Sequence, residues 1–449
     1  EIPHTIAIPR VPLHHLLSSA ARRFSKKTAL IFEGKRISYR QLNEECNRFA
    51  NFLRSIGIGE GDRVMLLLPN LPQMVIGFFG VLEAGAVAVF SLPTTDAEML
   101  AQQIHDTGSK VILTLDRFTP QIREVVSRLK KSESSPLEHI IISSIGDYLS
   151  LVKNVGLRIS QKQTEKFSST NLSPYVHEYR RVLTDQNRSP IDIDVSSEDL
   201  AVIQFTGGTT AEPKGVMHSH HSLLANALQT RHWMPRAVEG KECFLCVIPF
   251  SHSYGLTTGL NVPVALGASL ILKPNFEDVD ILKAIKKYHP TIFPGVPNIY
   301  VSIKDFPGVR KYGIDSIKAC ISGSAPLPVE VQEAFEKLTH GRLVEGYGLT
   351  EAGPVTHANP LEGSRKVGSI GIPLPSTESR VVDLIHRQQE VKVGQIGELA
   401  VRGPQVMIGY LNKPEETNSV LSADGWLLTG DVAQMDAEGY FRIIARKAD

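Results

Sequence analysis

Residues Gln204 to Gly215 read Q-F-T-G-G-T-T-A-E-P-K-G and follow the apolar run Leu200 to Ile203. An apolar run of this length, bounded by turn residues, is typical of a buried strand. The two glycines of the loop lack a Cβ, so several backbone N–H groups can point into one concavity that suits an anion. Threonine hydroxyls and the ammonium of Lys214 add donors and positive charge. The stretch therefore predicts a strand that opens into a phosphate-binding loop.

The loop differs from the phosphate loop of ordinary kinases and GTPases. That loop ends in Gly-Lys-Ser or Gly-Lys-Thr, whereas residues 213–215 read Pro-Lys-Gly. The alternative is a surface turn rich in glycine and threonine. The combination of two glycines, three threonines and a terminal Pro-Lys-Gly favours the phosphate-binding interpretation.

A second polar segment, residues 343–354, reads L-V-E-G-Y-G-L-T-E-A-G-P. Tyr347 stands between two glycines, so its ring is open to a stacking base. Thr350 supplies a hydroxyl, and Glu351 is the hard carboxylate that Mg²⁺ prefers when it is also held by substrate phosphates. The alternative is a tight turn with a core tyrosine.

A third pair of polar residues lies near the end of the chain. Asp431, in Thr429-Gly-Asp, can accept hydrogen bonds from both hydroxyls of a ribose, and Arg446 follows a strand-like run and can donate beside it. Each residue alone is a weak indication.

Composition excludes several classes of protein. With 449 residues the chain predicts two or three packed units, and a net charge of +1 provides no global field for nucleic acid or a bilayer. Four scattered cysteines are too few for a disulfide framework, which favours a reducing, cytoplasmic compartment. Cys243 and Cys246 form a C-x-x-C, but they lie in a strand-like run and are expected to be core residues.

Membrane insertion is not expected either. The N-terminus shows no basic region followed by an apolar one, so no signal peptide is predicted. The run 64–90 carries only Glu83 as a charge, but Pro69 and Pro72 divide it into strand, turn, helix and strand. Residues 147–166 form a basic, partly apolar stretch, for which a solvated cover is preferred and peripheral membrane contact remains open.

Hydrophobic periodicity predicts alternating strands and helices, which argues for parallel, helix-covered sheets. A capping box, Ser38 with Gln41, is expected to open a helix that stops at Gly57. The pattern weakens over residues 116–197, where polar, serine-rich stretches such as 130–135 are expected to be loop, and residues past 363 are expected to form a small all-β unit. The other expected helices are 13–24, 73–84, 97–107 and 279–288, and the other expected strands are 64–68, 86–90, 111–115, 243–248, 268–272, 291–293 and 317–321.

These segments together resemble the adenylate-forming superfamily, which includes acyl-CoA synthetases. The loop resembles its phosphate-binding signature, with Gly207 where serine is common and Ala211 where glycine is usual. G-Y-G-L-T-E resembles the adenine and magnesium motif, and Gly323-Ser-Ala-Pro326 resembles the backbone segment beside the adenine. The resemblance covers nearly the whole chain.

The resemblance implies an α/β fold: two helix-covered, largely parallel sheets packed together, plus a small β-barrel-like subdomain. It implies a large N-terminal domain over 1–440, with a first sheet at 58–215, a second at 13–57 and 216–342, and the small β subdomain at 343–440. Residues 441–449 resemble the start of a hinge, and the C-terminal domain that follows it in the family is absent from this sequence.

The resemblance also implies the site residues. The phosphate-binding set is Thr206, Gly207, Gly208, Thr209, Thr210 and Lys214. The adenine- and ribose-binding set is Gly323, Ser324, Ala325, Glu345, Gly346, Tyr347, Gly348, Asp431 and Arg446. Glu351 is the expected magnesium ligand, and the residues expected to act in catalysis are Lys214, Thr350, Glu351 and His252.

Residues 249–256, P-F-S-H-S-Y-G-L, resemble the segment beside the carboxylate substrate. Domains that activate amino acids place an aspartate near here to pair the ammonium, and this segment has none, so an uncharged tail is implied. Residues 292–300, 318–328 and 342–351 resemble long-chain fatty-acid CoA ligases. The acyl pocket implied by that likeness is His252, Tyr254, Gly255, Val296, Gly323 and Gly348, where small residues are expected to leave volume.

The implied reaction joins a fatty acid to CoA through an acyl-adenylate, with ATP, Mg²⁺ and CoA. The partners are these small molecules and not nucleic acid, and a homodimer remains open. In the family, a lysine of the C-terminal domain contacts the reacting groups, so this chain is expected to hold the ATP and acyl sites and to turn over poorly. Two alternatives share the motifs: a ligase that loads an acyl carrier protein, and a non-catalytic adenylate-binding module.

Overall fold

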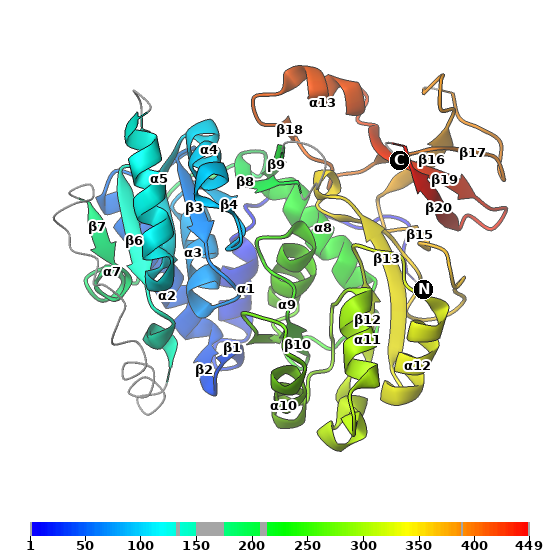
Figure 1. Cartoon of the computed structure of the whole chain (residues 1–449), viewed down its shortest axis with the longest axis horizontal. Coiled ribbons are helices and arrows are strands. Elements are labelled where there is room, and N and C mark those ends of the chain that lie inside the picture. The colour runs from blue at the N-terminus through cyan, green and yellow to red at the C-terminus, as the bar shows by residue number, and fades with distance from the viewer. Residues whose placement is uncertain (1, 132–134, 150–174, 207–212, 388, 448–449) are drawn as a thin grey trace.

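The computed structural model describes residues 2–131, 135–149, 175–206, 213–387 and 389–447. The chain has an α/β fold in which two large mixed sheets, flanked by helices, are joined by a common core, with a small antiparallel sheet near the C-terminus (Figure 1). The expected fold class is confirmed. Within the described residues no helix is long and apolar enough to cross a membrane.

The first sheet has eight strands in the order β18-β9-β8-β4-β3-β5-β6-β7, and those from β8 to β7 run parallel. β9 and β18 add antiparallel pairs at one edge. The bounds are β3 (Arg63–Leu67), β4 (Val87–Phe90), β5 (Ser109–Leu115), β6 (His139–Ser143), β7 (Val176–Glu178), β8 (Leu200–Phe205), β9 (Gly215–Ser219) and β18 (Gly409–Tyr410).

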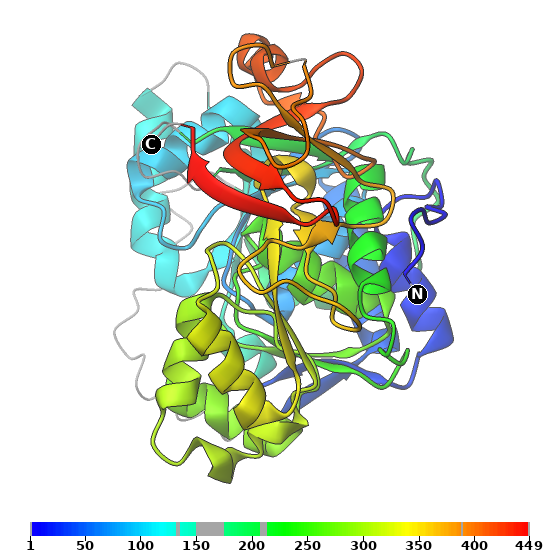
Figure 2. The same cartoon turned by 90° about the vertical axis from the view of Figure 1, so that its right-hand side faces the viewer.

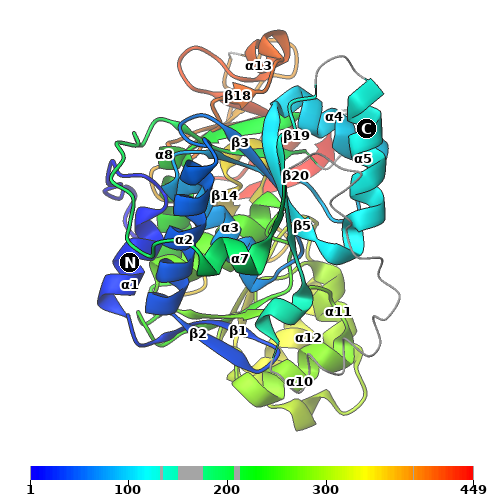
Figure 3. The same cartoon turned by 90° about the vertical axis from the view of Figure 1, so that its left-hand side faces the viewer.

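Both faces of this sheet are buried. Val64 and Leu66 of β3 face a core cluster shared with the second sheet, while Met65 and Leu67 face the outer helices, because alternate residues of a strand point to opposite faces. Figure 3 shows α4 (Ala97–Thr107) and α5 (Thr119–Lys131) on the side of β3 and β5 opposite to α2 (Tyr39–Ser55). Every residue of α3 (Pro72–Glu83) is buried, since it packs in the shared core.

The second sheet begins with β10 (Cys243–Cys246), β11 (Ser269–Leu272), β1 (Thr28–Phe32) and β2 (Lys35–Ser38), in that order. Ile292 pairs with β10 on one side and with β12 (Ala319–Ser322) on the other, each through a single bridge. The strand expected at 291–293 is therefore reduced to this one bridging residue. β13 (Arg342–Gly348), β14 (Val355–Ala358) and β15 (Ile372–Pro373) continue from β12.

The remaining helices cover this sheet and its loops. The capping box at Ser38 is confirmed: its Oγ accepts from the backbone N of Gln41, and its own N donates to Gln41 Oε1 at 3.0 Å. The bounds are α1 (His15–Arg23), α8 (His220–His232), the π-helical turn η3 (Gly255–Asn261), α9 (Val262–Ala265), α10 (Asp278–Tyr288), α11 (Pro297–Asp305), η4 (Val309–Tyr312), η5 (Ile314–Ser316) and α12 (Val329–Thr339).

The expected all-β unit near the C-terminus is an antiparallel sheet with the order β16-β17-β19-β20. It is open and not a barrel, because its outer strands do not pair with each other in the described residues. Figure 2 shows the red strands β19 and β20 lying over the yellow part of the second sheet. The bounds are β16 (Glu378–Val382), β17 (Ile396–Arg402), α13 (Pro414–Val420), β19 (Leu427–Met435) and β20 (Phe441–Arg446), with η6 (Thr350–Ala352) beneath them.

Between Asp116 and Ser197, where the sequence pattern weakens, the expected loop at 130–135 is wrong at Lys130 and Lys131, which end helix α5. The described part of this region has more regular structure than its pattern indicates. That part contains η1 (Asp116–Phe118), α5, β6, η2 (Ile145–Tyr148), β7 and α7 (Tyr179–Thr184). Helix α5 buries Ile122, Val125 and Leu129 at helical spacing, and the apolar run of β6 completes the sheet. Residues 150–174, with most of the basic stretch considered for membrane contact, lie outside the described residues.

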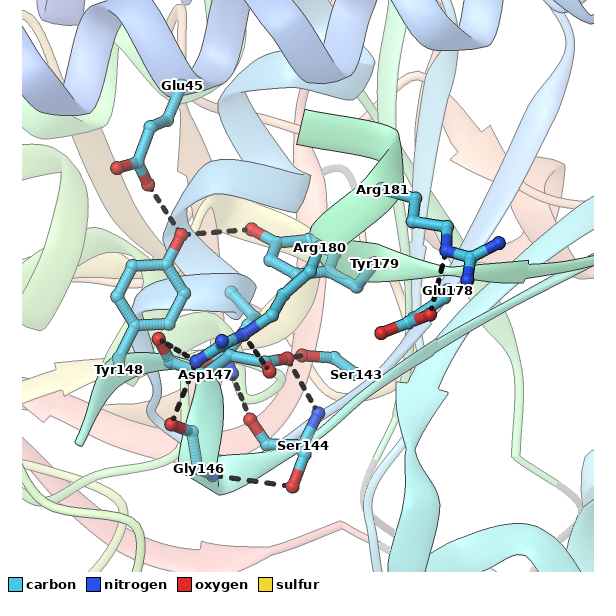
Figure 4. Close-up of polar contacts among 11 residues, drawn as sticks. Glu45, Ser143, Ser144, Gly146, Asp147, Tyr148, Glu178, Tyr179, Arg180 and Arg181 are labelled. Carbon is cyan, nitrogen blue, oxygen red and sulfur yellow. Dashed lines mark hydrogen bonds and ion pairs between the residues drawn. The ribbon is translucent and has the colours of Figure 1, made fainter. Parts of the chain in front are cut away.

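The turn after β6 is held by a polar cluster around Asp147 (Figure 4). The Asp147 carboxylate accepts from Ser143 Oγ at 2.8 Å, from the backbone N of Ser144 at 2.9 Å and from Arg180 Nε at 2.8 Å. The neighbouring Tyr148 hydroxyl donates to Glu45 of α2. The cluster thus fastens α2 and α7 to the edge of the first sheet.

All four cysteines are free thiols. Cys243 and Cys246 pack in different core clusters on the two faces of β10, as expected for residues three apart in a strand. The interpretation of this C-x-x-C as a pair of core cysteines is confirmed.

Candidate functional site

A cavity of about 210 Å³ lies where several strands of both large sheets end. Thr206 follows β8, Gly323 follows β12, and Tyr347 is near the end of β13, so strand ends bring these distant segments together. The cavity is lined by Thr206, His252, Ser253, Tyr254, Ile321, Gly323, Ser324, Gly346, Tyr347, Gly348, Leu349, Thr350, Glu351, Pro354, Val355, Asp431 and Arg446. Twelve of these residues are among those expected from the sequence.

Tyr347, Asp431 and Arg446 gather at one part of the cavity. Asp431 and Arg446 are register partners in the β19–β20 pair, and the Tyr347 hydroxyl donates to Asp431 Oδ2. Arg446 Nε lies 3.9 Å from Asp431 Oδ1. Burial, and then the charge of Asp431, raise the pKa of Tyr347 well above its usual range, so its hydroxyl remains a donor. The aromatic ring can stack on a base, and the carboxylate and the guanidinium can form hydrogen bonds with a sugar.

Thr350 and Glu351 are fixed through their backbones in η6. The Thr350 carbonyl accepts from His218 Nε2 at 2.7 Å, and the Glu351 carbonyl accepts from Met407 N at 2.8 Å. Burial lowers the pKa of His218 to about 4, so the ring is neutral, and its Nδ1 is placed to accept from Ser222 Oγ at 3.1 Å.

Only one carboxylate oxygen of Glu351 is engaged by the described protein residues. Its Oε1 accepts from the Tyr410 hydroxyl at 2.7 Å, while its Oε2 has no hydrogen-bond partner among the described residues. In the part of the chain that the structure describes, no three His, Cys, Asp or Glu side chains gather as a metal site. A single free carboxylate oxygen beside a phosphate site fits Mg²⁺, which usually takes one or two carboxylates together with substrate phosphates.

The two ends of the phosphate loop are pinned to each other. Thr206 N donates to the Lys214 carbonyl at 2.9 Å, and Lys214 N donates to Thr206 Oγ1 at 3.0 Å. The Lys214 ammonium lies 2.6 Å from Glu416 Oε2 and 4.8 Å from the centre of the Tyr410 ring. The expected residues Gly207, Gly208, Thr209 and Thr210 lie outside the described residues.

His252 also lines the cavity. Its Nδ1 accepts from Tyr254 N at 3.2 Å. Part of the side chain is exposed to solvent, but protein atoms surround most of it, as is usual for a residue that lines a cleft. This crowding lowers its pKa through desolvation, so the ring is neutral at pH 7. Asn70 fixes the segment, since it donates to the Ile248 carbonyl and accepts from Phe250 N.

Lys214, Gly255, Val296, Ala325 and Glu345 do not line the cavity. Burial raises the pKa of Glu345 to about 7. A Cβ on Gly255 would lie 2.1 Å from the Pro249 carbonyl oxygen, and one on Gly348 would lie 2.0 Å from that of Pro354. The small size of these two glycines therefore allows close backbone packing, and their place in an acyl pocket stays a prediction.

Sequence reasoning missed the residues that hold the expected ones in place. His218, Tyr410 and Glu416 contact Thr350, Glu351 and Lys214 from other parts of the chain. Tyr410 reaches the site because the two-residue strand β18 pairs with β9, the strand that follows the phosphate loop. A strand this short has no periodicity from which it could be found.

Two cavities several times larger lie elsewhere in the described part of the chain. One of about 800 Å³ is lined by residues such as Arg236, Lys318 and Arg342, and one of about 940 Å³ by residues such as Trp233 and Phe441. Neither includes an expected site residue. The smaller cavity is the candidate site because the aromatic, acidic and basic groups converge only there among these three.

The chain is similar to several known proteins. A long-chain-fatty-acid–CoA ligase of Bacillus subtilis (strain 168) is 42% identical over 454 residues, covering 100% of this chain and 79% of that protein. An anthranilate CoA ligase solved with anthranoyl-AMP has a TM-score of 0.84 at 24% identity, covering 99% of this chain and 79% of that one. ATP-bound MatB from Rhodopseudomonas palustris has a TM-score of 0.81 at 25% identity, covering 97% and 79%.

The family described as AMP-binding enzyme matches residues 17–411, most of the chain. The match spans β8, both described ends of the phosphate loop, and the segment with Tyr347 and Glu351. The chain therefore belongs to the AMP-binding enzyme family.

Proposed function

We propose that this protein activates a fatty acid with ATP, through an acyl-adenylate, and transfers the acyl group to CoA. The observation that carries the proposal is the convergence of Tyr347, Glu351 and Asp431 on one cavity beside the strand that leads into the phosphate loop. The long-chain-fatty-acid–CoA ligase of Bacillus subtilis supports the substrate class. The structural neighbours solved with ATP and with an acyl-adenylate support the nucleotide.

Each cavity residue has a role in this proposal. Tyr347 stacks on the adenine, and Asp431 and Arg446 hold the ribose. Thr206, the loop after it and Lys214 hold the phosphates that leave. Thr350 lies beside the α-phosphate, and its hydroxyl is 3.4 Å from Ser253 Oγ. Glu351 is the ligand of Mg²⁺, which when bound neutralises charge on the phosphates.

The chemistry consists of two displacements. A carboxylate oxygen of the acid bonds to the α-phosphorus as the bond to the bridging oxygen breaks, and pyrophosphate leaves. The CoA thiolate then bonds to the acyl carbon, and AMP leaves with the electron pair. The chain's own residues act mainly by positioning and by charge, which dominate phosphoryl chemistry. His252, neutral and beside the cavity, orients the carboxylate, and the 249–256 segment offers no acidic partner for an ammonium.

The test is ATP–pyrophosphate exchange by the full-length protein across acids from acetate to oleate. We expect exchange that depends on a long-chain acid, followed by acyl-CoA formation when CoA is added. If exchange occurs without acyl-CoA formation and a carrier protein is acylated instead, then the acyl acceptor is the carrier protein and not CoA. Absence of exchange with every acid would reject catalysis.

Several finer features belong to the same proposal. The division into a large domain over 1–440 and a hinge from 441 follows the resemblance in sequence. Peripheral membrane contact rests on the basic stretch 147–166, and the oligomeric state, monomer or homodimer, is open as well. Light scattering and sedimentation with anionic vesicles test the last two. A monomer that stays in the supernatant would reject both the homodimer and the membrane contact.

A further inference from the structure

Tyr410 touches both charged groups of the proposed phosphate and magnesium site. Its hydroxyl donates to Glu351 Oε1 at 2.7 Å, and the face of its ring lies 4.8 Å from the Lys214 ammonium. One side chain thus contacts the carboxylate and the lysine, although it follows them in sequence by 59 and 196 residues.

The backbone of Tyr410 is tightly held. It pairs with Val216 in the β18–β9 ladder, its N donates to Thr417 Oγ1 at 2.9 Å, and the next residue, Leu411, donates to the Gly215 carbonyl at 2.8 Å. The side chain is 6% exposed. Because Gly215 directly follows Lys214, the tyrosine is fastened to the same strand as the lysine that it contacts.

The contacts leave one oxygen of Glu351 available. A carboxylate side chain can rotate, and it can form an ion pair with a nearby ammonium. Either change would move its oxygens away from a bound metal. The Tyr410 hydroxyl restrains Oε1, so Oε2 is the atom left toward a ligand. Burial, then the Glu351 charge, raise the pKa of Tyr410, so the hydroxyl keeps its proton at neutral pH.

Tyr410 also keeps the Lys214 ammonium away from the Glu351 carboxylate. The Lys214 ammonium rests on the Tyr410 ring and pairs with Glu416 Oε2 at 2.6 Å, while Glu416 Oε1 lies 3.2 Å from Lys413. A cation over an aromatic face is attracted by the ring quadrupole. With one of its three donors on Glu416, the ammonium keeps two for phosphate oxygens.

We propose that Tyr410 is a positioning residue that presents Glu351 to the magnesium-bound triphosphate and keeps Lys214 from pairing with that carboxylate. The inference rests on the proposed function, because it takes Glu351 as the magnesium ligand. Tyr410 contacts no reacting atom in this account and acts through Glu351 and Lys214.

The test measures nucleotide binding without turnover. The full-length protein is titrated with α,β-methylene-ATP by calorimetry, once with Mg²⁺ and once with EDTA. Tyr410→Phe keeps the ring and removes the hydroxyl, so affinity with Mg²⁺ should fall about tenfold, and affinity in EDTA should change less than about twofold. Tyr410→Leu also removes the ring, so affinity in EDTA should fall as well, by about threefold.

Tyr440→Phe is the matched control. The Tyr440 ring lies 5.0 Å from the Lys366 ammonium and its hydroxyl donates to the Ser364 carbonyl at 2.8 Å, so the same kinds of contact are lost away from the cavity. This variant should bind the nucleotide as the wild type does in both conditions.

A double-mutant cycle with Glu351→Gln separates positioning from general damage. The effect of Tyr410→Phe should disappear in the Glu351→Gln background, because both changes remove the same magnesium contact. Equal loss in the two backgrounds would overturn the inference, even if the variant were less stable. A loss in Glu351→Gln alone, with Tyr410→Phe unchanged from wild type, would overturn the inference and leave the magnesium assignment standing. Wild-type affinity that is the same with Mg²⁺ and EDTA would overturn both.

Discussion

Two clusters in this molecule pair a buried tyrosine hydroxyl with a carboxylate, one around Asp147 and one at the cavity. In the first, Tyr148 donates to Glu45, and burial raises the pKa of that carboxyl (Figure 4). In the second, Tyr347 donates to Asp431 and Tyr410 donates to Glu351. The local chemistry of the two clusters is nearly the same.

The clusters differ in where their members lie. Around Asp147, three donors to its carboxylate come from the end of β6, the turn after it and α7, and none of the cluster's members lines the cavities described above. At the site, Tyr347 and Glu351 of one segment meet Asp431, which lies 84 residues after Tyr347 in the chain, and all three line one cavity. A perturbed pKa or a buried ion pair therefore does not identify a site in this chain, whereas convergence on a cavity does.

The sharpest test of this contrast is Asp431→Ala. We expect kcat/KM for ATP in pyrophosphate exchange to fall about 100-fold, because a charged acceptor for the ribose is lost. The melting temperature should fall only slightly, since Asp431 and Tyr347 line the cavity, where water can replace the lost carboxylate as the partner of the Tyr347 hydroxyl. Activity within threefold of wild type would remove Asp431 from the nucleotide site.

The reverse pattern is expected for Asp147→Ala. The side chain is 13% exposed and accepts from Arg180, so its loss leaves donors unsatisfied and should lower the free energy of unfolding by about 2 kcal/mol. Urea denaturation measures that change. KM for ATP below the transition should be unchanged, and a rise in KM with stability intact would contradict the structural role.

The smallest expected effect concerns pH. Burial lowers the folded-state pKa of His218 to about 4 from an ordinary 6.5, so its contribution to stability is present above pH 6.5 and is lost as pH falls toward 4. His218→Gln keeps a donor for the Thr350 carbonyl and removes the titration. It should reduce the fall in stability by up to about 1.4 kcal/mol per pH unit near pH 5. Unfolding measured from pH 7 to 4.5 tests this, and an unchanged slope would mean that His218 is protonated in the folded protein.

Much of the fold was predictable because local signals agree with it. The helix at 97–107 has an acidic cap at Asp96 and a glycine at its end, and the Ser38 capping box begins α2 as expected. The motifs also predicted Tyr347, Glu351 and Asp431, which share the cavity. An aromatic residue and two carboxylates in these motifs fit few roles other than nucleotide binding.

The features that the sequence did not predict depend on pairing between strands that are distant in the chain. β7 has three residues and β18 two, so each depends on a neighbouring strand rather than on its own pattern. The contacts of Tyr410 with Glu351 and of Glu416 with Lys214 arise from that pairing. The reason for a glycine at 255 or 348 is the backbone carbonyl of Pro249 or Pro354, which lies in the same stretch of sequence but comes close only in the folded turn.

A crystal structure of the full-length protein with ATP and Mg²⁺ tests the central claim most directly. We expect the nucleotide in the 210 Å³ cavity, with its ribose on Asp431, its adenine on Tyr347 and the metal on Glu351. A nucleotide bound in either larger cavity, with this one empty, would contradict the account.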